Sequence, residues 1–307
     1  MKISDVLLSK NGHVTITLAK EFLKCQVGKR VPTVSQFSEK YQLARGTVQN
    51  ALTSLQQCNA IKLDAKGHKG SYLVKKNVAI LLKFIGINSI VGVMPLPYSK
   101  RYEGLASGLM VTLENNFDIS PAMAFMRGAK NRTRMLLTNR YDFAIISKIA
   151  AQHIIDKDDN IIIALSFGPQ SYLSEYVVIF SDEKHTEIKD GMRVGIDNEY
   201  VDQKFLTEKV CKEKNVTYVN YDYSQILQRV IQGDIDAAIW NKDEIEEKLC
   251  DVKYYPIEIL SPEANEAVLV VSKERPELAT LLNEIVDPKA VIEIQQLVLK
   301  GKITPSY

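Results

Sequence analysis

Three polar side chains in one predicted helix could form hydrogen bonds to nucleic-acid bases. Arg45, Gln49 and Asn50 lie in residues 45–57, where apolar residues recur at the i, i+3, i+4, i+7 spacing of a helix. Side chains of these types can form paired hydrogen bonds to guanine or adenine, and the amino-terminal end of a helix favours phosphate. The spacing therefore predicts a helix that is anchored by its apolar stripe and reads bases from its other faces.

The neighbouring segments have the order of a winged helix-turn-helix. Residues 34–41 predict a short helix that begins after Thr33 as N-cap, and a turn of about three residues separates it from the base-reading helix. Residues 60–64 and 71–75 predict two strands around a basic, glycine-flanked tip. Such a hairpin is suited to contact a DNA backbone or minor groove.

The charge of the chain is unevenly distributed. Residues 1–76 carry 13 Lys and Arg against 4 Asp and Glu, a net charge of +9, and the remaining residues carry 26 against 33, a net charge of −7. A compact basic segment joined to an acidic body is typical of a nucleic-acid-binding module fused to another domain. We therefore predict that the first part binds double-stranded operator DNA.

The helix pair and hairpin resemble the winged helix of GntR-type regulators, at Pro32-Thr33, residues 44–52 and residues 67–70. Gln49 stands where that pattern often has Arg, and Asn59 where it often has Gly, which leaves the base preference open. The resemblance implies base reading by Arg45 and Gln49, to which the amide of Asn50 is added on its chemistry. It also implies that two threonines contact the phosphate backbone of DNA and that the hairpin tip contacts DNA. For the histidine of the tip, the alternative is a side chain that is only solvated. The residues with these further roles are Thr33 and Thr47 for phosphate and His68 and Lys69 for the tip.

From residue 89 onward, short apolar strands alternate with amphipathic helices, which is typical of an α/β fold. Two strand patterns recur within this part. Residues 89–94 resemble residues 192–197, each with a central Val-Gly, and residues 141–147 resemble residues 235–241, each with an Asp before a small-apolar strand. The recurrence predicts two lobes of like design, although two unrelated α/β domains in succession would also fit.

In type 2 periplasmic-binding-protein folds, the sequence of one lobe is interrupted by the other lobe, so the chain crosses between the lobes twice. The cleft between the lobes closes around a small solute. We therefore expect an α/β chain with an N-terminal winged helix-turn-helix and a two-lobed domain of this type. The expected parts are a DNA-binding domain in 1–76, a connector in 77–88 and an effector domain in 89–307, with the first lobe in about 89–170 and 265–307 and the second in about 180–260.

Ligands of open α/β sheets bind beyond the carboxyl ends of the strands. At the start of the helix expected near Arg101, exposed backbone amides together with Lys100 or Arg101 favour a carboxylate or phosphate. Asp197 could receive an ammonium group, and Trp240 could form an apolar or cation-binding wall. A core position for Trp240 and a capping role for Asp197 remain the alternatives. These residues predict a small anionic or zwitterionic metabolite. The expected effector-binding residues are Tyr98, Ser99, Lys100, Arg101, Ser147, Asp197, Gln203, Trp240 and Asn241.

Two large parts of the chain, residues 12–76 and 86–108, resemble the YhfZ group of bacterial transcriptional regulators, and the similarity extends over nearly the whole sequence. Its most specific parts are residues 98–104 and 233–240. That group is a GntR-like winged helix joined to a domain similar to solute-binding proteins. The resemblance implies ligand-controlled transcription but does not supply the effector.

The sequence contains no motif typical of an enzyme, a metal site or a membrane span. The sequence lacks Gly-x-Ser-x-Gly, Walker, Gly-x-Gly-x-x-Gly and His-Glu-x-x-His patterns, and its four cysteines have no zinc-type spacing. It also lacks the ~18 uninterrupted apolar residues of a membrane span and the apolar run of a signal peptide. We expect a cytoplasmic protein with no catalytic residue, cofactor or metal.

The predicted function is transcription control by an effector that closes the two lobes and acts through the connector. Operator symmetry implies a homodimer. The alternative is a solute-binding or catalytic protein with a vestigial winged-helix head.

Overall fold

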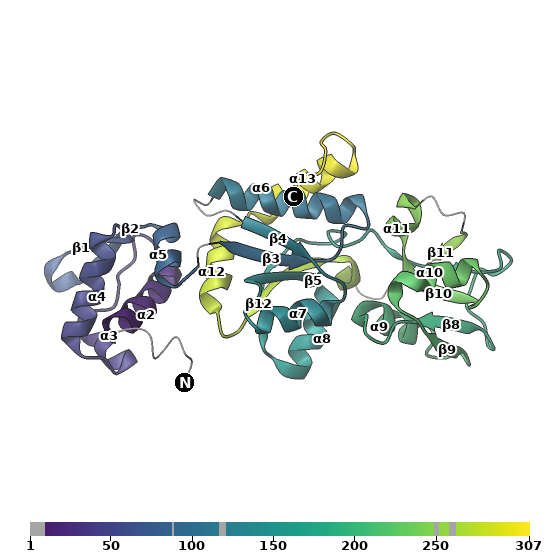
Figure 1. Ribbon diagram of the computed structural model, residues 1–307, viewed down its shortest axis with the longest axis horizontal. Coiled ribbons are helices and arrows are strands. Elements are labelled where there is room, and N and C mark those ends of the chain that lie inside the picture. The colour runs from purple at the N-terminus through teal and green to yellow at the C-terminus, as the bar shows by residue number, and fades with distance from the viewer. Residues whose placement is uncertain (1–9, 88, 117–120, 249–251, 258–261) are drawn as a thin grey trace. The chain divides into compact units, whose positions relative to one another are not determined.

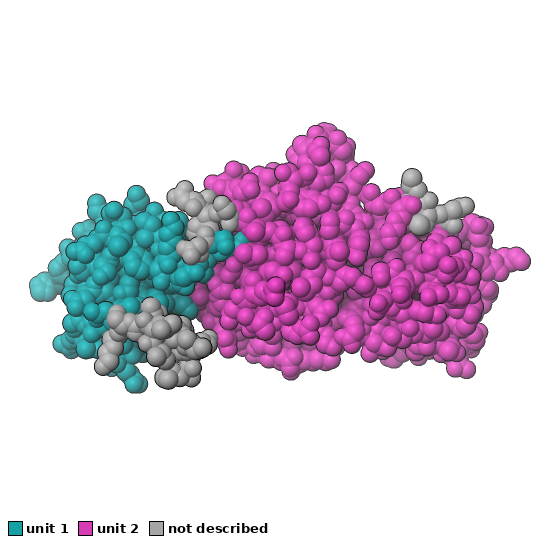
Figure 2. All heavy atoms as spheres, viewed as in Figure 1, with its two compact units in different colours: residues 1–90, 117–120 teal, residues 91–116, 121–307 magenta. Residues whose placement is uncertain are grey.

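The computed structural model describes residues 10–87, 89–116, 121–248, 252–257 and 262–307. The chain divides into two compact units, shown in Figure 2. Unit 1 comprises residues 1–90 and 117–120, and unit 2 comprises residues 91–116 and 121–307. Each unit is described separately.

Unit 1 contains a helix-turn-helix followed by a two-stranded antiparallel hairpin (Figure 1). The aromatic rings of Phe22 and Phe37 pack in its core, 6.2 Å apart. Gln42 adopts a left-handed conformation that ends the first helix of the pair. The elements are α2 (Lys10–Lys24), α3 (Val34–Tyr41), α4 (Arg45–Gln57), β1 (Ile61–Ala65), η1 (Gly67–Lys69), β2 (Ser71–Lys76) and α5 (Val78–Phe84).

Unit 2 contains two five-stranded sheets, each covered by helices, and we call each sheet with its helices a lobe (Figure 1). The first lobe has the strand order β4-β3-β5-β12-β6, and the second has the order β11-β7-β10-β8-β9. The first lobe consists of β3 (Ile90–Met94), α6 (Lys100–Asn116), β4 (Pro121–Phe125), α7 (Ala129–Leu137), β5 (Phe143–Ser147), α8 (Lys148–Asp158), β6 (Ile161–Ser166), η2 (Pro262–Asn265), β12 (Ala267–Ser272), α12 (Pro276–Ile285) and α13 (Pro288–Leu299). The second lobe consists of β7 (Tyr176–Phe180), β8 (Arg193–Ile196), α9 (Val201–Val210), β9 (Thr217–Asn220), α10 (Tyr223–Ile231), β10 (Ala237–Asn241), α11 (Lys242–Glu247) and β11 (Tyr254–Pro256).

The strand patterns that recur in the sequence form equivalent parallel pairs in the two lobes. β3 pairs in parallel with β5, and β8 pairs in parallel with β10. In the first lobe β5 also pairs with the antiparallel strand β12, and in the second lobe β10 also pairs with the antiparallel strand β7. The two lobes therefore share one sheet topology.

The start of α6 is held by close packing against α13. A Cβ atom on Gly108 would lie 2.5 Å from the backbone oxygen of Val291, so only glycine permits this approach. Gln295, which is fully buried on α13, donates hydrogen bonds from its amide to the backbone oxygens of Arg101 and Ser171, each at 2.9 Å. These contacts fix the first turn of α6 beside the segment that leads from the first lobe to the second.

Candidate functional site

The polar residues predicted to read bases are exposed on α4. Arg45, Gln49 and Asn50 lie outside the buried stripe of this helix, and α4 contains no acidic residue. Ala44 precedes the helix and forms no side-chain cap. The amino-terminal half of α4 therefore exposes three side-chain donors, Arg45 in the first turn and Gln49 and Asn50 in the second, together with backbone N–H groups of the first turn.

The two threonines predicted to contact phosphate differ in exposure. Thr33 is exposed and forms a capping box with Gln36, in which its hydroxyl accepts the Gln36 N–H at 3.2 Å and the Gln36 side chain accepts the Thr33 N–H at 2.8 Å. Thr47 is half-buried on α4. The hydroxyl hydrogen of Thr33 remains available to an outside acceptor, because capping uses the oxygen as acceptor.

The hairpin tip is formed by the short turn η1, on which His68 and Lys69 are exposed. Arg30 is a basic residue that sequence reasoning missed here. It pairs with Tyr72 as an isolated antiparallel bridge, and its guanidinium lies across Gly70, where a Cβ atom would come within 2.7 Å of Nε. The only sequence signal for it was the Lys29-Arg30 pair ahead of Pro32.

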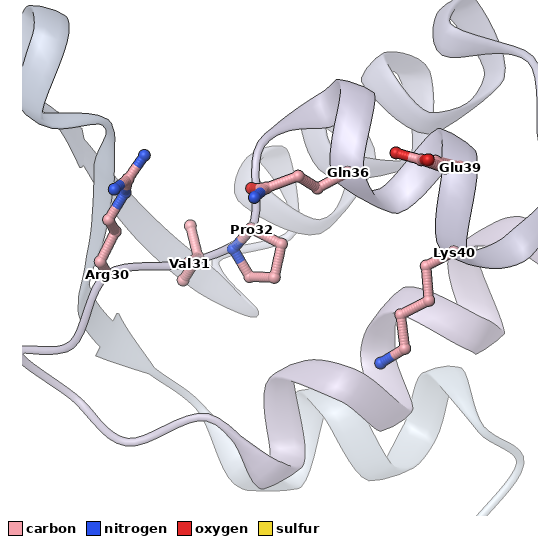
Figure 3. Close-up of a pocket in the computed structure, with 6 residues that line it drawn as sticks. All are labelled: Arg30, Val31, Pro32, Gln36, Glu39 and Lys40. Atoms are coloured by element: carbon pink, nitrogen blue, oxygen red, sulfur yellow. The ribbon is translucent and has the colours of Figure 1, made fainter.

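A shallow hollow of about 540 Å³ separates Arg30 from α3 (Figure 3). Pro32 and Gln36 line its centre, and Glu39 and Lys40 line the side opposite Arg30. The Lys40 ammonium forms a 2.8 Å ion pair with Glu21. Arg30 is thus an exposed basic side chain next to the predicted phosphate-contacting Thr33.

Ser147 and Asn241, predicted effector residues, cap helices at the ends of β5 and β10. The Ser147 hydroxyl accepts the Ala150 N–H at 3.1 Å and donates to the Asp202 carboxylate of the other lobe at 2.6 Å. The Asn241 side chain accepts the Asp243 N–H at 3.0 Å. Both residues are buried, so their capping atoms face the protein.

Asp197, Gln203 and Trp240 are buried within the second lobe. Asp197 accepts the Tyr223 N–H at the start of α10 at 2.7 Å, and Gln203 connects the Asp197 N–H to the Gly195 oxygen. The Trp240 ring stacks on Tyr223 with centroids 4.0 Å apart. These contacts agree with the alternative roles, helix capping for Asp197 and core packing for Trp240, and effector contact by the three residues stays a prediction.

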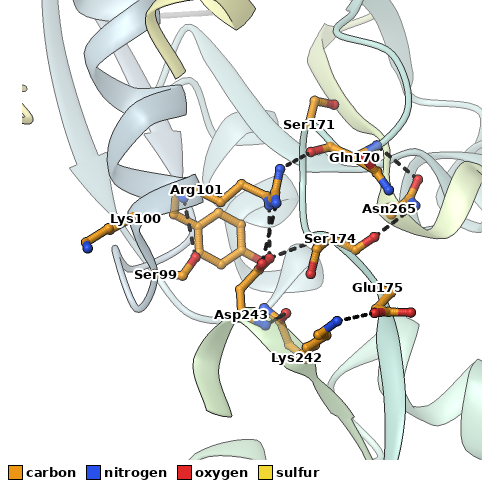
Figure 4. Close-up of polar contacts among 12 residues, drawn as sticks. Ser99, Lys100, Arg101, Gln170, Ser171, Ser174, Glu175, Lys242, Asp243 and Asn265 are labelled. Carbon is orange, nitrogen blue, oxygen red and sulfur yellow. Dashed lines mark hydrogen bonds and ion pairs between the residues drawn. The ribbon is translucent and has the colours of Figure 1, made fainter. Parts of the chain in front are cut away.

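The effector-binding residues predicted at the start of α6 do not contact one common point, and each has its own partners or is exposed (Figure 4). The Arg101 guanidinium bridges the lobes, with Nε 3.0 Å from Asp243 Oδ2 and Nη1 2.7 Å from the Gln170 oxygen. The side chain of Lys100 points away from this cluster in Figure 4, and its backbone N–H donates to Glu247. Ser99 is buried and accepts the Tyr102 N–H, whereas Tyr98 is exposed.

A second group of buried or half-buried side chains, of which the sequence reasoning named only Trp240, includes residues of both lobes. Tyr200, Tyr223 and Trp240 form a continuous stack, with centroids 4.4 and 4.0 Å apart. The other members are Tyr102, Arg132, Tyr172, Tyr176, Asp202 and Glu244. The available signal was the presence of tyrosines and carboxylates beside predicted strand ends in the second lobe.

Burial controls the ionisation of the two carboxylates in this group. Burial raises the pKa of Asp202 to about 6, although the Ser147 hydroxyl and the charge of Arg132 oppose the rise. Burial also raises the pKa of Glu244 to about 7, opposed by Lys248 and by the hydrogen bond from Tyr223. Both carboxyl groups are therefore poised to change charge when a charged ligand binds near them.

Several buried donors at the start of β7 and the end of β10 lack an acceptor. Among the described residues, Ser174 Oγ, Tyr176 Oη and Trp240 Nε1 are buried and have no hydrogen-bond partner. Each such group costs about 1–3 kcal/mol if it stays unpaired. Native proteins rarely leave several together unless something else satisfies them.

The described part of the chain contains no group of three or more His, Cys, Asp or Glu side chains placed to hold a metal ion. Within the same residues, no helix combines the length and apolar character of a membrane span.

Comparison with known families identifies both units. Residues 77–307 match the family described as the YhfZ C-terminal domain, and residues 26–73 match a family described as a helix-turn-helix domain. The chain is 35% identical over 304 residues to a protein of Escherichia coli (strain K12) called "Uncharacterized protein YhfZ", with 98% of both chains covered. The chain belongs to the YhfZ family. The predicted resemblance to this group is confirmed.

Solved structures show what fold this YhfZ-family chain has. It is similar to the crystal structure of YhfZ from Shigella flexneri with a TM-score of 0.62 and 36% identity, over 74% of this chain and 97% of that one. It also resembles the methionine-binding protein MetQ (TM-score 0.52, 11% identity, 72% and 98% covered) and the VFT2 domain of Bordetella pertussis BvgS (TM-score 0.52, 12% identity, 72% and 97% covered). The last two show the fold alone. The predicted fold class, a helix-turn-helix domain followed by a binding-protein-like α/β domain, is confirmed.

Proposed function

We propose that this YhfZ-family protein is a cytoplasmic, homodimeric transcription regulator of GntR-like design. A small anionic or zwitterionic metabolite, bound between the lobes of unit 2, sets its affinity for an operator. The observation that carries the proposal is the exposed set of donors Arg45, Gln49 and Asn50 at the start of α4, in a helix-turn-helix domain. Direct base readout needs such donors at the start of a recognition helix.

The effector part of the proposal is supported by the contacts between the lobes. The Arg101–Asp243 pair and the Ser147–Asp202 hydrogen bond join groups from opposite lobes, so closing or opening the lobes makes or breaks them. Ser174, whose hydroxyl is buried without a partner among the described residues, donates its N–H to Asp243, the residue that Arg101 pairs with. A ligand that supplies acceptors there would favour the closed arrangement, and this shift is the signal proposed to reach unit 1.

The DNA-binding part is tested by selecting duplexes from a random pool with the full-length chain and measuring affinities by fluorescence anisotropy. Arg45→Ala should weaken binding to the selected duplex about 5- to 150-fold, as expected for a lost two-pronged base contact. Arg140→Ala is the matched control, because Arg140 is an exposed arginine of unit 2. Equal affinity of both variants and the unchanged chain would contradict base reading by α4.

Sequence specificity provides a second measurement on the same helix. Gln49→Ala should reduce the preference for the selected duplex over unrelated DNA, because a base contact discriminates among sequences. Gln57→Ala, at the exposed far end of α4, should leave that preference unchanged. Sedimentation of the chain with and without the duplex tests the homodimer, and a monomer under both conditions would overturn it.

A further inference from the structure

Arg132 is a buried cation with neutral partners. It lies on α7 with only 2% of its surface exposed. Its guanidinium donates from Nε to the Ile145 oxygen (3.0 Å), from Nη1 to the Met126 oxygen (2.7 Å) and from Nη2 to the Tyr172 hydroxyl (3.1 Å). Among the described residues, no carboxylate forms an ion pair with it.

This arrangement leaves part of the hydrogen-bonding capacity of Arg132 unused. A guanidinium has five N–H groups, and the three bonds described occupy one on each nitrogen. One N–H on each terminal nitrogen therefore remains, in the fork that matches a planar anion. A buried cation whose contacts are all neutral groups is costly, and Asp202 is near Arg132 but does not contact it, so an anion bound in direct contact would be favoured.

The other cationic candidate at this edge is already neutralised. Arg101 was predicted to bind the anionic part of an effector, but its guanidinium pairs with Asp243, and the two side chains are 12% and 11% exposed. An anion that took this guanidinium would leave Asp243 buried without its partner. Arg132 carries no such competing carboxylate ion pair.

The surroundings of Arg132 favour a singly charged anion. The Asp202 carboxylate is close enough for the charge of Arg132 to lower its pKa, so a dianionic phosphate would face repulsion from this neighbour. Tyr172, which contacts Arg132, is near enough to Tyr176 to influence its ionisation, and the Tyr176 hydroxyl has no partner among the described residues. A carboxylate carries a single negative charge and has two oxygens that can accept hydrogen bonds, so it fits this site.

We propose that Arg132, oriented by Tyr172, binds a carboxylate group of the effector, and that the effector is therefore a small carboxylic acid. This inference rests on the proposed function for the presence of an effector and names its recognised group. It assigns the anion to α7 of the first lobe, in place of the predicted Lys100 and Arg101.

The test compares acids with their own amides. The full-length chain is heated with a panel of amino, hydroxy and keto acids, and each acid is paired with its primary amide. At least one acid, at about 100 times its Kd, should raise Tm by roughly 5 °C, and its amide should raise Tm by less than about 1 °C. Equal shifts by acid and amide, or no shift with any acid, would overturn the carboxylate assignment.

Variants of the two contacting residues locate the site. Arg132→Lys keeps the charge but removes the fork, and should weaken binding of the stabilising acid at least tenfold. Because this buried change can also disturb folding, Tyr172→Phe provides a milder second variant that removes only one hydroxyl. It should weaken the acid about 3- to 10-fold and leave the affinity of the amide unchanged.

Tyr307→Phe is the matched control for the phenol, since the Tyr307 hydroxyl contacts Glu103 and is exposed. It should bind the acid as the unchanged chain does. Loss of acid binding in Tyr307→Phe equal to that in Tyr172→Phe would reject the assignment to Arg132 and Tyr172.

The same acid is finally added to the complex with the selected duplex. If it binds through Arg132 but leaves the DNA affinity unchanged, the proposed regulation fails and the carboxylate site stands. If DNA affinity instead responds to a neutral compound that ignores Arg132→Lys, the regulation stands and the carboxylate site fails.

Discussion

The two lobes of unit 2 repeat one arrangement around their central parallel strands. In the first lobe the Asp142 carboxylate accepts the Val91 N–H at 2.8 Å, and in the second the Asp236 carboxylate accepts the Arg193 N–H at 2.7 Å. Each of these aspartates also pairs with an arginine, Arg275 in the first lobe and Arg193 in the second. The aspartate ahead of the second strand of each pair therefore has the same role in both lobes, although it binds the Val of Val-Gly in the first lobe and the residue before that Val in the second.

The edges where the lobes meet differ in charge. The first lobe contributes the cations Arg101 and Lys130, and the second contributes their partners Asp243 and Glu199. Asp202, which receives the Ser147 hydrogen bond, also belongs to the second lobe. The Asp-centred contacts that the two lobes share therefore stabilise each lobe internally, whereas the complementary charges at the edges stabilise the contact between the lobes.

The largest expected effect comes from the buried pair between the lobes. Arg101→Met should lower the free energy of unfolding of unit 2 by about 3–5 kcal/mol, because it leaves the Asp243 carboxylate buried without its cation. Lys130→Met should lower it by less than about 1 kcal/mol, since the Lys130 and Glu199 side chains are 67% and 73% exposed. Urea unfolding followed by fluorescence of Trp240, the single tryptophan, measures both.

Equal losses in these two variants would show that the lobes are not held together mainly by the buried pair. A double-mutant cycle with Asp243→Asn separates the pair from other effects of removing Arg101. The coupling energy should account for most of the loss.

The pH dependence of stability should originate in the second lobe. Burial raises the folded-state pKa of Glu244 from 4.5 to about 7, so folding favours the protonated carboxyl. Its contribution to stability is full below about pH 4.5 and is lost as pH rises through about 7. Glu244→Gln mimics the protonated form, so it should match the unchanged chain near pH 4.5 and exceed its stability at pH 8 by about 3 kcal/mol.

The control for this titration is Glu246→Gln, an exposed carboxylate on the same helix. It should leave the pH profile of unfolding unchanged. A parallel profile for Glu244→Gln and the unchanged chain would exclude Glu244 as an origin of the pH dependence. Asp202, with its pKa raised to about 6, should add a slope of the same sign that persists in Glu244→Gln.

Local patterns in the sequence predict the elements well, because each depends on nearby residues. The helices expected at 34–41 and 45–57 have those bounds, and β5 and β10 end at Ser147 and Asn241, the polar residues at which the patterns of 141–147 and 235–241 end. Thr33 is the predicted N-cap because capping needs only the next three residues.

Apart from Trp240, the buried group that includes residues of both lobes was missed, because its burial depends on distant contacts. Arg132 lies in the polar stretch Lys130-Asn131-Arg132, which is typical of a solvated helix, and its acceptors include Ile145, 13 residues away. Asp202 lies at the start of α9, and its hydroxyl donor Ser147 is 55 residues away in the other lobe. Periodicity cannot report such contacts, since they arise only when two lobes pack.

The smallest expected effect compares the glycines of the two Val-Gly strands, which face different positions of the neighbouring strand: Gly92 pairs with Phe143, and Gly195 pairs with Ala238. A Cβ atom on Gly92 would overlap the buried ring of Phe143, which cannot move within its sheet, so Gly92→Ala should lower the free energy of unfolding by about 2 kcal/mol. A Cβ atom on Gly195 would lie 2.5 Å from Ile235 Cδ1, the flexible end of a side chain, so Gly195→Ala should cost less than about 1 kcal/mol. Urea unfolding of both variants measures the difference. Equal costs would mean that the two strand pairs are packed alike and that the lobes differ only at their edges.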